Sequence, residues 1–470
     1  MECAWPDAYE LMRFLLAVVL LLAALVAVTI VPARLAGTAG APGPPRLVIV
    51  LTIDALRADH LGTYGYTRPT SPNIDAFARD AVVIDQAIAQ APYTKASIAS
   101  LMTGLYPSGH KTITTAYSVE EAMRGDVRGT PPKTDILPSA VVTMAEAFKA
   151  AGYTTAAITT NPFLIRDFGF AQGFDRFEFM GGEGFAHADA VLGRALHEIG
   201  DGATRLFLWV HLMEPHSPYS PPAAVREGLP PLQPPELVPP SVAIPAWISV
   251  EGSRDVRFYE SLYDGEIRVA DTAFGAFVTA LRARDLWPET ALVVTADHGE
   301  QFMEHGGFEH NTNLYDELVR VPLVIRVPGL APRYVHAQVQ LVDVMPTLLT
   351  LVGAHVPPMI NGRDVGPLLR GERMHAEAAF AEIAGQQYMV RTPEWKLVAT
   401  PDGGRELFAL TRDPREQHPV THPRRTAELL QVLDGLLESA LRLGARIDGE
   451  TGPVRSDSRR RLEALGYIQR

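Results

Sequence analysis

The chain has 470 residues, of which 47% are hydrophobic and 20% charged, and its formal net charge is −12. This composition excludes an intrinsically disordered chain, and because the 42 basic residues are scattered along it, nucleic acid is not expected as a partner. The single cysteine, Cys3, precedes the first apolar segment, which excludes disulfides and thiolate metal sites from the folded body.

The N-terminal region contains an apolar run, residues 14–31, without a charged side chain and flanked by Arg13 and Arg34. Its length lies between that of a signal-peptide core and that of a membrane-spanning helix. Either interpretation exports the body, and residues 1–45, which end in a Pro/Gly-rich linker, are expected to form an uncleaved membrane anchor. The body is then periplasmic or extracellular, or secreted if the segment is cleaved. A buried core helix is the third alternative.

Three short apolar runs rich in Val, Leu and Ile predict strands that are buried on both faces, as in parallel sheets. They cover residues 47–53, 206–210 and 291–296. Helical patterns lie between them, for example at 141–151 and 264–284. This alternation predicts an α/β fold with a mostly parallel central mixed sheet flanked by helices.

Each predicted strand ends at a polar side chain: Asp54, His211, and the pair Asp297 and His298. Taken singly, Asp54 is typical of a helix N-cap and the pair of a turn. Together with the hydroxyl of Thr94, however, the set supplies two carboxylates and an imidazole at the edge where parallel strands place ligand sites. These ligands suit one divalent ion, Ca²⁺, Mn²⁺, Mg²⁺ or Zn²⁺, which would attract an anionic substrate to a negatively charged protein.

The remainder of the chain contains a proline-rich stretch and a change of pattern near its C-terminus. Residues 215–256 are expected to form a surface insertion near the mouth of the site. Alternating patterns at 388–390 and 395–399 predict a small antiparallel sheet, and residues 426–443 a helix. The predicted domains are 46–371 and a small C-terminal α+β subdomain, 372–470.

An ordered series of motifs covers nearly all of the chain after residue 45. The series reads TIDALRADHLGTYGYTRPTSPNIDAFA (52–78), APYTKASIASLMTGLYPSGH (91–110), WVHLMEPHSPY (209–219), TADHGEQFMEHGGFEHNTNLYDELVRVPLVIRVPG (295–329), VDVMPTLLTLVGAHVPPMINGRDVGPLLRG (342–371), ELFALTRDPRE (406–416) and LEALGYI (462–468). It resembles the sulfatase branch of the alkaline phosphatase superfamily. The resemblance implies an alkaline phosphatase-like fold and a metal-dependent hydrolase of sulfate or phosphate esters.

The resemblance also implies roles for individual side chains. It places a divalent metal on Asp54, Asp297 and His298, with Thr94 as a further ligand and as the nucleophile. Other histidines match positions that contact the anionic group or protonate the leaving oxygen, although capping a strand or bonding a backbone carbonyl is a structural alternative for His211 and His305. Two lysines near the nucleophile segment are candidates for anion binding, with surface lysines as the alternative. The expected catalytic residues are Thr94, His211 and His310, and the expected substrate-binding residues are His216, His305, Lys95 and Lys111.

The chain departs from the family pattern at the nucleophile. Sulfatases carry Cys-x-Pro-Ser-Arg or Ser-x-Pro-Ser-Arg, whose first residue is oxidised to formylglycine, whereas residues 94–98 here read TKASI. Threonine cannot give that aldehyde, because its Cβ carries a methyl group. Proteins of the superfamily with threonine here include phosphoethanolamine and phosphoglycerol transferases and phosphodiesterase-like hydrolases, in which a threonine alkoxide attacks phosphorus.

Three functions therefore remain open. The first is an ester hydrolase in which Thr94 favours phosphorus chemistry. The second is a membrane-anchored transferase of a phosphoalcohol group from lipid to glycan. The third is a catalytically silent homologue that binds anionic glycans. In all three the partner is an anionic ester or polymer, such as a glycan or a lipid.

Overall fold

The computed structural model describes residues 43–114, 133–182, 185–202, 204–245, 248–250 and 252–464. The chain divides into two units, Met1–Gly43 and Pro44–Arg470, and the described elements belong to the second. Within these ranges no helix combines the length and apolar character needed to cross a membrane. The apolar run 14–31 lies outside the described residues, so the predicted anchor stays a prediction.

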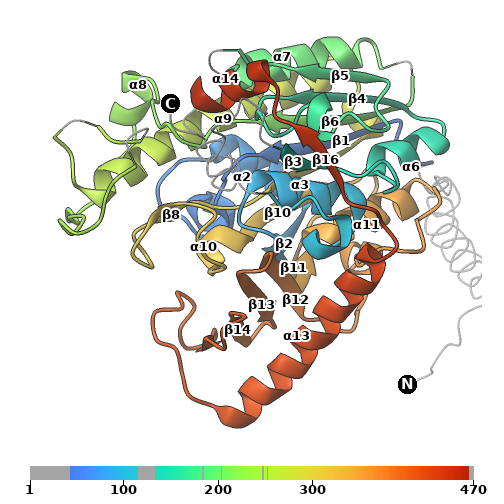
Figure 1. Cartoon of the computed structure of the whole chain (residues 1–470). Helices are drawn as coiled ribbons and strands as arrows, with labels where there is room; N and C mark the ends of the chain where they lie inside the picture. The colour runs from blue at the N-terminus through green and yellow to red at the C-terminus, as the bar shows by residue number, and fades with distance from the viewer. Residues whose placement is uncertain are drawn as a thin grey trace, which may run out of the picture. The chain divides into compact units, whose positions relative to one another are not determined.

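A mixed eight-stranded sheet forms the centre of the second unit (Figure 1). Its strands are β1 (Leu47–Ile53), β2 (Val82–Ile88), β4 (Thr154–Thr159), β5 (Arg176–Phe179), β6 (Leu206–Leu212), β7 (Thr290–Ala296), β10 (Arg320–Arg326) and β11 (Arg333–Gln340). They lie in the order β11-β2-β10-β7-β1-β6-β4-β5. Only β10 runs against the other strands of this sheet.

The three strands predicted from apolar runs are the central ones, and every residue in them is buried. In the register of the sheet, Ile53 lies beside Leu212 on one side and beside Ala296 on the other. The side chains that follow these strands therefore emerge at one edge. Strand β6 runs two residues beyond the predicted end, so His211 lies within the strand and not after it.

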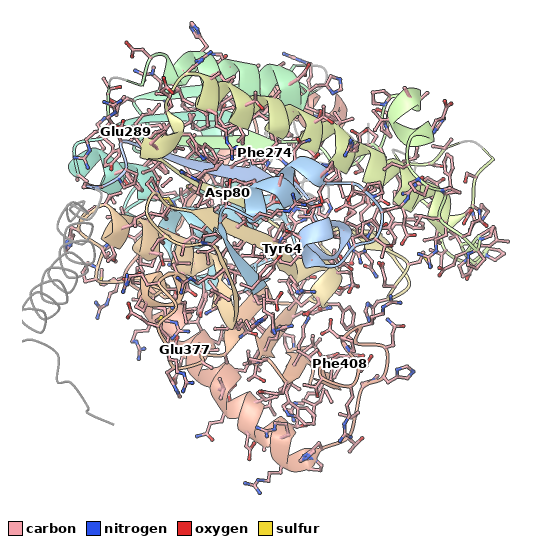
Figure 2. All side chains as sticks on the ribbon, turned by 180° about the vertical axis from the view of Figure 1, so that it is seen from behind. Tyr64, Asp80, Phe274, Glu289, Glu377 and Phe408 are labelled. Carbon is pink, nitrogen blue, oxygen red and sulfur yellow. The ribbon has the colours of Figure 1, made fainter. Side chains whose placement is uncertain are left out.

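Helices cover both faces of the sheet (Figures 1 and 2). One group is α2 (Pro72–Ala78), α7 (Ala188–Ile199) and α9 (Val256–Ala283), and the other is α3 (Thr94–Thr103), α6 (Met144–Ala150) and α11 (Val344–Leu351). The predicted α/β class is thereby confirmed. Helix α9 begins eight residues before its predicted start, where the Asp255 side chain caps it by accepting a hydrogen bond from the backbone N–H of Arg257 (3.1 Å).

A second, antiparallel sheet follows, as the alternating patterns predict. It comprises β12 (Ala379–Ile383), β13 (Gln387–Arg391), β14 (Trp395–Ala399) and β15 (Arg405–Ala409), and α13 (Pro423–Gly444) packs against it. Leu429 and Leu433 of α13 share a core with Phe380 and Leu397 of the sheet. Figure 2 labels Phe274 on α9 and Phe408 on β15, one in each of the two layered parts.

The last part of the chain returns to the large sheet region. Strand β16 (Glu450–Pro453) pairs with β3 (Lys133–Ile136), and α14 (Ser456–Ala464) follows it. The predicted boundary between domains 46–371 and 372–470 stays a prediction. The remaining short elements are α4 (Pro107–His110), α8 (Ala223–Glu227) in the proline-rich stretch, the hairpin β8 (Gln301–Phe302) and β9 (Phe308–Glu309), α10 (Asp316–Val319) and α12 (Gly366–Leu369).

Candidate active site

Three side chains at the edge of the central strands form a cluster that fits a metal ion. Asp54 follows β1, and Asp297 and His298 follow β7; all three are fully buried. His298 Nε2 lies 3.6 Å from Asp54 Oδ1 and 3.4 Å from Asp297 Oδ2. Among the described residues neither of these two oxygens has a hydrogen-bond partner. Because unpaired buried carboxylate oxygens are costly, two of them turned toward one imidazole nitrogen fit a divalent cation.

The second oxygen of each carboxylate is held by the protein. Asp297 Oδ1 accepts hydrogen bonds from the backbone N–H groups of Ala55 (3.1 Å) and His298 (3.0 Å). His298 Nδ1 lies 2.8 Å from the carbonyl oxygen of Gly299, which assigns the proton to Nδ1 and leaves the lone pair of Nε2 for a metal. The ligand atoms are thus oriented before any ion binds.

Asp54 is fixed by two side chains, Asn161 after β4 and His211 in β6. Its Oδ2 accepts a hydrogen bond from Asn161 Nδ2 (2.7 Å) and lies 3.1 Å from His211 Nε2. Burial by itself would raise the pKa of Asp54, but the interactions with His216, His211 and His298, including the hydrogen bond from His211, hold that pKa below its ordinary value. Asp54 is therefore ionised, as a metal ligand must be.

Thr94 is the first residue of α3, and its hydroxyl lies beside the cluster. Thr94 Oγ1 is 3.2 Å from His298 Nε2 and 3.3 Å from Asn161 Nδ2. The first turn of the helix presents its positive dipole end here, which favours negative charge on this oxygen. The predicted nucleophile and the three predicted metal ligands are thus brought together.

His211 lies behind Asp54 in a chain of buried polar groups. The indole N–H of Trp209 donates to Thr52 Oγ1 (3.0 Å), which is 2.7 Å from His211 Nδ1. With the threonine hydroxyl donating to Nδ1, His211 Nε2–H donates to Asp54 Oδ2. This contact orients the carboxylate of Asp54, and the catalytic role expected of His211 from the sequence stays a prediction.

His310 lies next to the cluster, and His216 lies next to His310. The ring centroid of His310 is 4.3 Å from that of His298 and 4.9 Å from that of His216. Burial and the nearby charge of His298 lower the pKa of His310 to about 3, so its imidazole is neutral in the protein without metal. A small pocket adjoins them, lined by Tyr93, Thr94, Lys95, Thr114, Phe163, His310 and Asn311.

The ammonium groups of both candidate lysines contact other parts of the protein. Lys95 is 2% exposed, so the alternative that it is a surface lysine is wrong. Its Nζ pairs with Asp135 Oδ1 (2.6 Å) and donates to Thr134 Oγ1 (2.8 Å). Lys111 Nζ donates to the carbonyl oxygen of Ile447 near the C-terminus.

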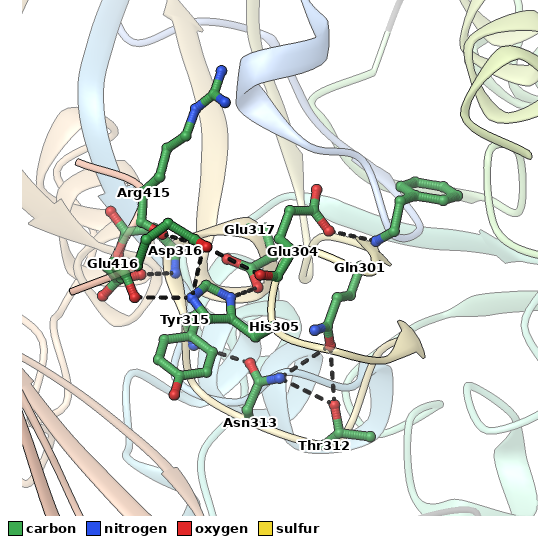
Figure 3. A network of polar contacts seen from close by, with 12 residues as sticks. Gln301, Glu304, His305, Thr312, Asn313, Tyr315, Asp316, Glu317, Arg415 and Glu416 are labelled. Carbon is green, nitrogen blue, oxygen red and sulfur yellow. Dashed lines mark hydrogen bonds and ion pairs between the residues drawn. The ribbon is translucent and has the colours of Figure 1, made fainter. Parts of the chain in front are cut away.

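His305 belongs to a different network, shown in Figure 3. Its Nδ1 is 2.6 Å from Glu317 Oε1, its Nε2 is 3.0 Å from the carbonyl oxygen of Glu416, and its ring stacks on Tyr315 with centroids 3.6 Å apart. Both ring nitrogens therefore contact the protein itself. The structural alternative, a bond to a backbone carbonyl, is the contact observed.

Four side chains of the site were not predicted from the sequence. Asn161 and Thr52 contact the residues described above, Glu300 contacts His310, and Tyr219 contacts Glu300. Asn161 follows the short apolar strand β4, so the reasoning that identified Asp54 would also have found it. The other three carry no such positional signal.

Comparison with known proteins agrees with this geometry. A family model described as Sulfatase matches residues 46–354, and one described as N-sulphoglucosamine sulphohydrolase, C-terminal, matches residues 303–442. Arylsulfatase K of Mus musculus is 31% identical over 212 residues, which are 37% of this chain and 38% of that protein. Arylsulfatase K of Xenopus laevis is 32% identical over 204 residues, 40% of this chain and 37% of that protein. The chain thus matches less than two fifths of the length of these relatives.

Solved structures share the fold over most of their length. Phosphonate monoester hydrolase of Agrobacterium radiobacter has a TM-score of 0.67 at 20% identity, covering 86% of this chain and 96% of that one. A protein solved in complex with its substrate D-glucosamine-2-N,6-O-disulfate has a TM-score of 0.68 at 19% identity, covering 85% and 98%. At these identities the likeness shows the fold.

Proposed function

The chain belongs to the sulfatase family, and on that premise we propose that it is a metal-dependent hydrolase of sulfate or phosphate esters with Thr94 as its nucleophile. The observation that carries the proposal is the position of Thr94 Oγ1, 3.2 Å from His298 Nε2, beside two carboxylate oxygens without partners among the described residues. A binding protein that had lost catalysis would have no need of such an arrangement.

Each side chain of the site would have its own role. Asp54, Asp297 and His298 would hold a divalent cation, which supplies positive charge that lowers the pKa of a neighbouring hydroxyl and polarises the ester. Thr94 Oγ1, having released its proton to solvent, attacks sulfur or phosphorus and the bond to the leaving oxygen breaks. Asn161 Nδ2–H donates to the nucleophile oxygen and so holds it in place.

Proton transfer completes the cycle. His310, neutral in the free protein, takes up a proton from solvent as the anionic ester binds and gives it to the leaving oxygen, which departs as an alcohol. Water then attacks the Thr94 ester: its hydroxyl leaves on the sulfate or phosphate and its other proton passes to Thr94 Oγ1, so that each turnover ends with the groups as they began. The ring of His216 lies next to that of His310, with centroids 4.9 Å apart.

The identity of the ester follows from the nucleophile. Thr94 cannot become formylglycine, whose hydrated form releases sulfate, so a covalent ester with Thr94 must be opened by water. Phosphorus esters suit that route, and a phosphonate monoester hydrolase shares the fold, whereas the curated relatives are named arylsulfatases. The primary candidates are therefore phosphodiesters and phosphonate monoesters, followed by sulfate esters.

The test is an activity screen with sulfate, phosphodiester and phosphonate esters of one leaving alcohol, each with Ca²⁺, Mn²⁺, Mg²⁺ and Zn²⁺. We expect turnover of at least one ester and a loss of about 10³-fold or more in Thr94→Ala, as for removal of other nucleophiles. The matched control is Thr103→Ala in the same helix, where the hydroxyl donates to the carbonyl of Ala99 (2.7 Å) away from the cluster. Full activity of Thr94→Ala would contradict the nucleophile assignment, and no turnover with any ion would contradict the hydrolase.

A further inference from the structure

A buried carboxylate contacts one ring nitrogen of His310, Nδ1. Glu300 is fully buried, and its Oε1 is 3.1 Å from His310 Nδ1. Its Oε2 accepts a hydrogen bond from the hydroxyl of Tyr219 (2.8 Å), itself buried. Both oxygens of the carboxylate are therefore directed, one by a tyrosine and one by the imidazole.

The backbone around His310 is held in an uncommon conformation. Glu309 and Asn311, the residues on either side of it, have φ angles of 69° and 73°, in the left-handed region that residues other than glycine seldom adopt. The backbone N–H of Asn311 donates to the carbonyl oxygen of Pro92 (3.0 Å), in the segment that leads into α3. Such conformations persist where the surrounding structure over-determines them, often at functional sites.

These contacts decide which nitrogen of His310 reaches the pocket. Because Nδ1 faces Glu300, Nε2 lies on the opposite side of the ring, and His310 lines the pocket together with Thr94. We propose that Glu300 is a positioning residue, which accepts a hydrogen bond from Nδ1–H of His310 and so presents Nε2 to the leaving oxygen of the substrate. The catalytic part of this inference rests on the proposed hydrolase, whereas the state of the ring does not.

The contact with Glu300 decides which nitrogen of His310 transfers a proton to the leaving oxygen. In a ring fixed through Nδ1–H, Nε2 is the nitrogen that carries the moving proton. It takes up a proton from solvent when the anionic ester binds and passes it to the leaving oxygen as the ester bond breaks, which returns the ring to its neutral Nδ1–H form. Without an acceptor at residue 300 the neutral ring can exchange its tautomer and rotate, and this step is lost while nucleophilic attack remains.

The variants Glu300→Met and Glu300→Gln separate positioning from packing. Methionine fills a similar volume without an acceptor, whereas glutamine keeps an oxygen that can accept from Nδ1–H. Glu382→Met is the matched control, because Glu382 is a fully buried carboxylate whose hydrogen bonds, both 2.6 Å, are with Ser108.

The first readout is kcat/KM along a series of aryl esters of the class that the activity screen identifies. For Glu300→Met we expect a loss of about 10²-fold with a phenyl ester and of less than about threefold with a dinitrophenyl ester, whose leaving group needs no proton. Glu300→Gln should recover most of the loss. The double variant Glu300→Met/His310→Ala should be no worse than His310→Ala, because one residue acts through the other. Equal losses along the series, or additive losses, would overturn the proposal.

The second readout needs no turnover. Nitrogen-15 spectra of histidine-labelled full-length protein should show His310 as the Nδ1–H tautomer, identified by its disappearance in His310→Ala. Glu300→Met should shift the ring toward the other tautomer, and Glu300→Gln and Glu382→Met should not. An unchanged His310 signal in Glu300→Met would refute the positioning role. If the spectra respond as expected but no ester is hydrolysed, the proposed function fails while the role of Glu300 stands.

Discussion

One amide group links the proposed nucleophile to a proposed metal ligand. Asn161 Nδ2 lies within hydrogen-bond distance of both Asp54 Oδ2, which follows β1, and Thr94 Oγ1, at the start of α3. Its carbonyl oxygen accepts from the backbone N–H of Phe163 (2.9 Å), which assigns the orientation of the amide. An alkoxide on Thr94 would thus find a hydrogen-bond donor that is already aligned.

Replacing Asn161 with alanine should therefore impair catalysis more than folding. We expect kcat/KM to fall by about 10²-fold or more, the usual effect of removing one donor from a developing negative charge. The comparison is with Asn313→Ala, since Asn313 donates to Gln301 Oε1 (3.0 Å) outside the cluster. Steady-state kinetics with a thermal melt of each variant would check this, and a kcat/KM of Asn161→Ala equal to that of the wild type would contradict it.

At the scale of elements, helix α9 contains a buried carboxylate whose protonation bears on stability. Glu266 is 7% exposed and accepts a hydrogen bond from the backbone N–H of Ser220 (2.7 Å), at the start of the proline-rich stretch. Burial raises the pKa of Glu266 from 4.5 to about 7, and the neighbouring charge of Glu214 adds to the effect.

The sign of the resulting pH dependence follows from linkage. Between pH 4.5 and about 7 the folded chain holds a proton on Glu266 that the unfolded chain releases. The stabilising contribution of the neutral Glu266 to the free energy of unfolding is therefore complete below pH 4.5 and is lost as the pH rises to about 7. Glu266→Gln should match the wild type at low pH and exceed its free energy of unfolding at pH 8, by about 3 kcal/mol at most. Urea unfolding at both pH values measures this, with exposed Glu438→Gln as control. A pH-independent difference would contradict it.

The elements also show what could be predicted from the sequence. The runs that became β1 and β7 are continuously apolar, and Asp54, Asp297 and His298 follow them directly, so strand burial and ligand positions were both predictable. The reversed direction of β10 was not, because direction depends on how the chain crosses the sheet. The contacts of His305 and Lys95 were equally hidden, since the sequence does not say which carboxylates, here Glu317 and Asp135, fold against them.

At the scale of the whole molecule, a buried charge network joins the small sheet to the segment around α10. Lys396 of β14 is fully buried and pairs with Asp316 Oδ1 and with Glu416 Oε1, each at 2.8 Å. Arg391 also pairs with Asp316 (2.8 Å). The same network includes His305, and Figure 3 shows Asp316 and Glu416 beside it.

Lys396→Met should destabilise the protein strongly, because it leaves the buried carboxylate of Glu416 without a cation and Asp316 with Arg391 alone. The expected loss is about 3–5 kcal/mol in the free energy of unfolding, typical of a broken buried pair. Lys149→Met is the control: the Lys149 side chain is 54% exposed, and its pair with Asp175 should contribute less than about 1 kcal/mol. Guanidinium unfolding measures the free energy of unfolding of both variants, and similar losses in the two would contradict the prediction.

Metal should stabilise the fold, because the ligand atoms come together only in the native state. At a free metal concentration 100 times Kd we expect a gain of about 2.7 kcal/mol, seen as a melting temperature that rises with metal and falls with chelator. Asp297→Asn keeps the oxygen that accepts the backbone N–H groups of Ala55 and His298 but removes the charge. The melting temperature of Asp297→Asn should rise only weakly with added metal, and a rise equal to that of the wild type would argue against this ligand set.

The order of the strands sets the time at which an ion can be captured during synthesis. Asp54 leaves the ribosome about 240 residues before Asp297, yet β1 and β7 are direct neighbours in the finished sheet. A nascent chain that has emerged only as far as β6 contains one carboxylate of the pair and no His298. If Asp54, Asp297 and His298 bind the metal as proposed, its uptake must therefore follow insertion of β7 beside β1, and an ion met earlier finds an incomplete ligand set.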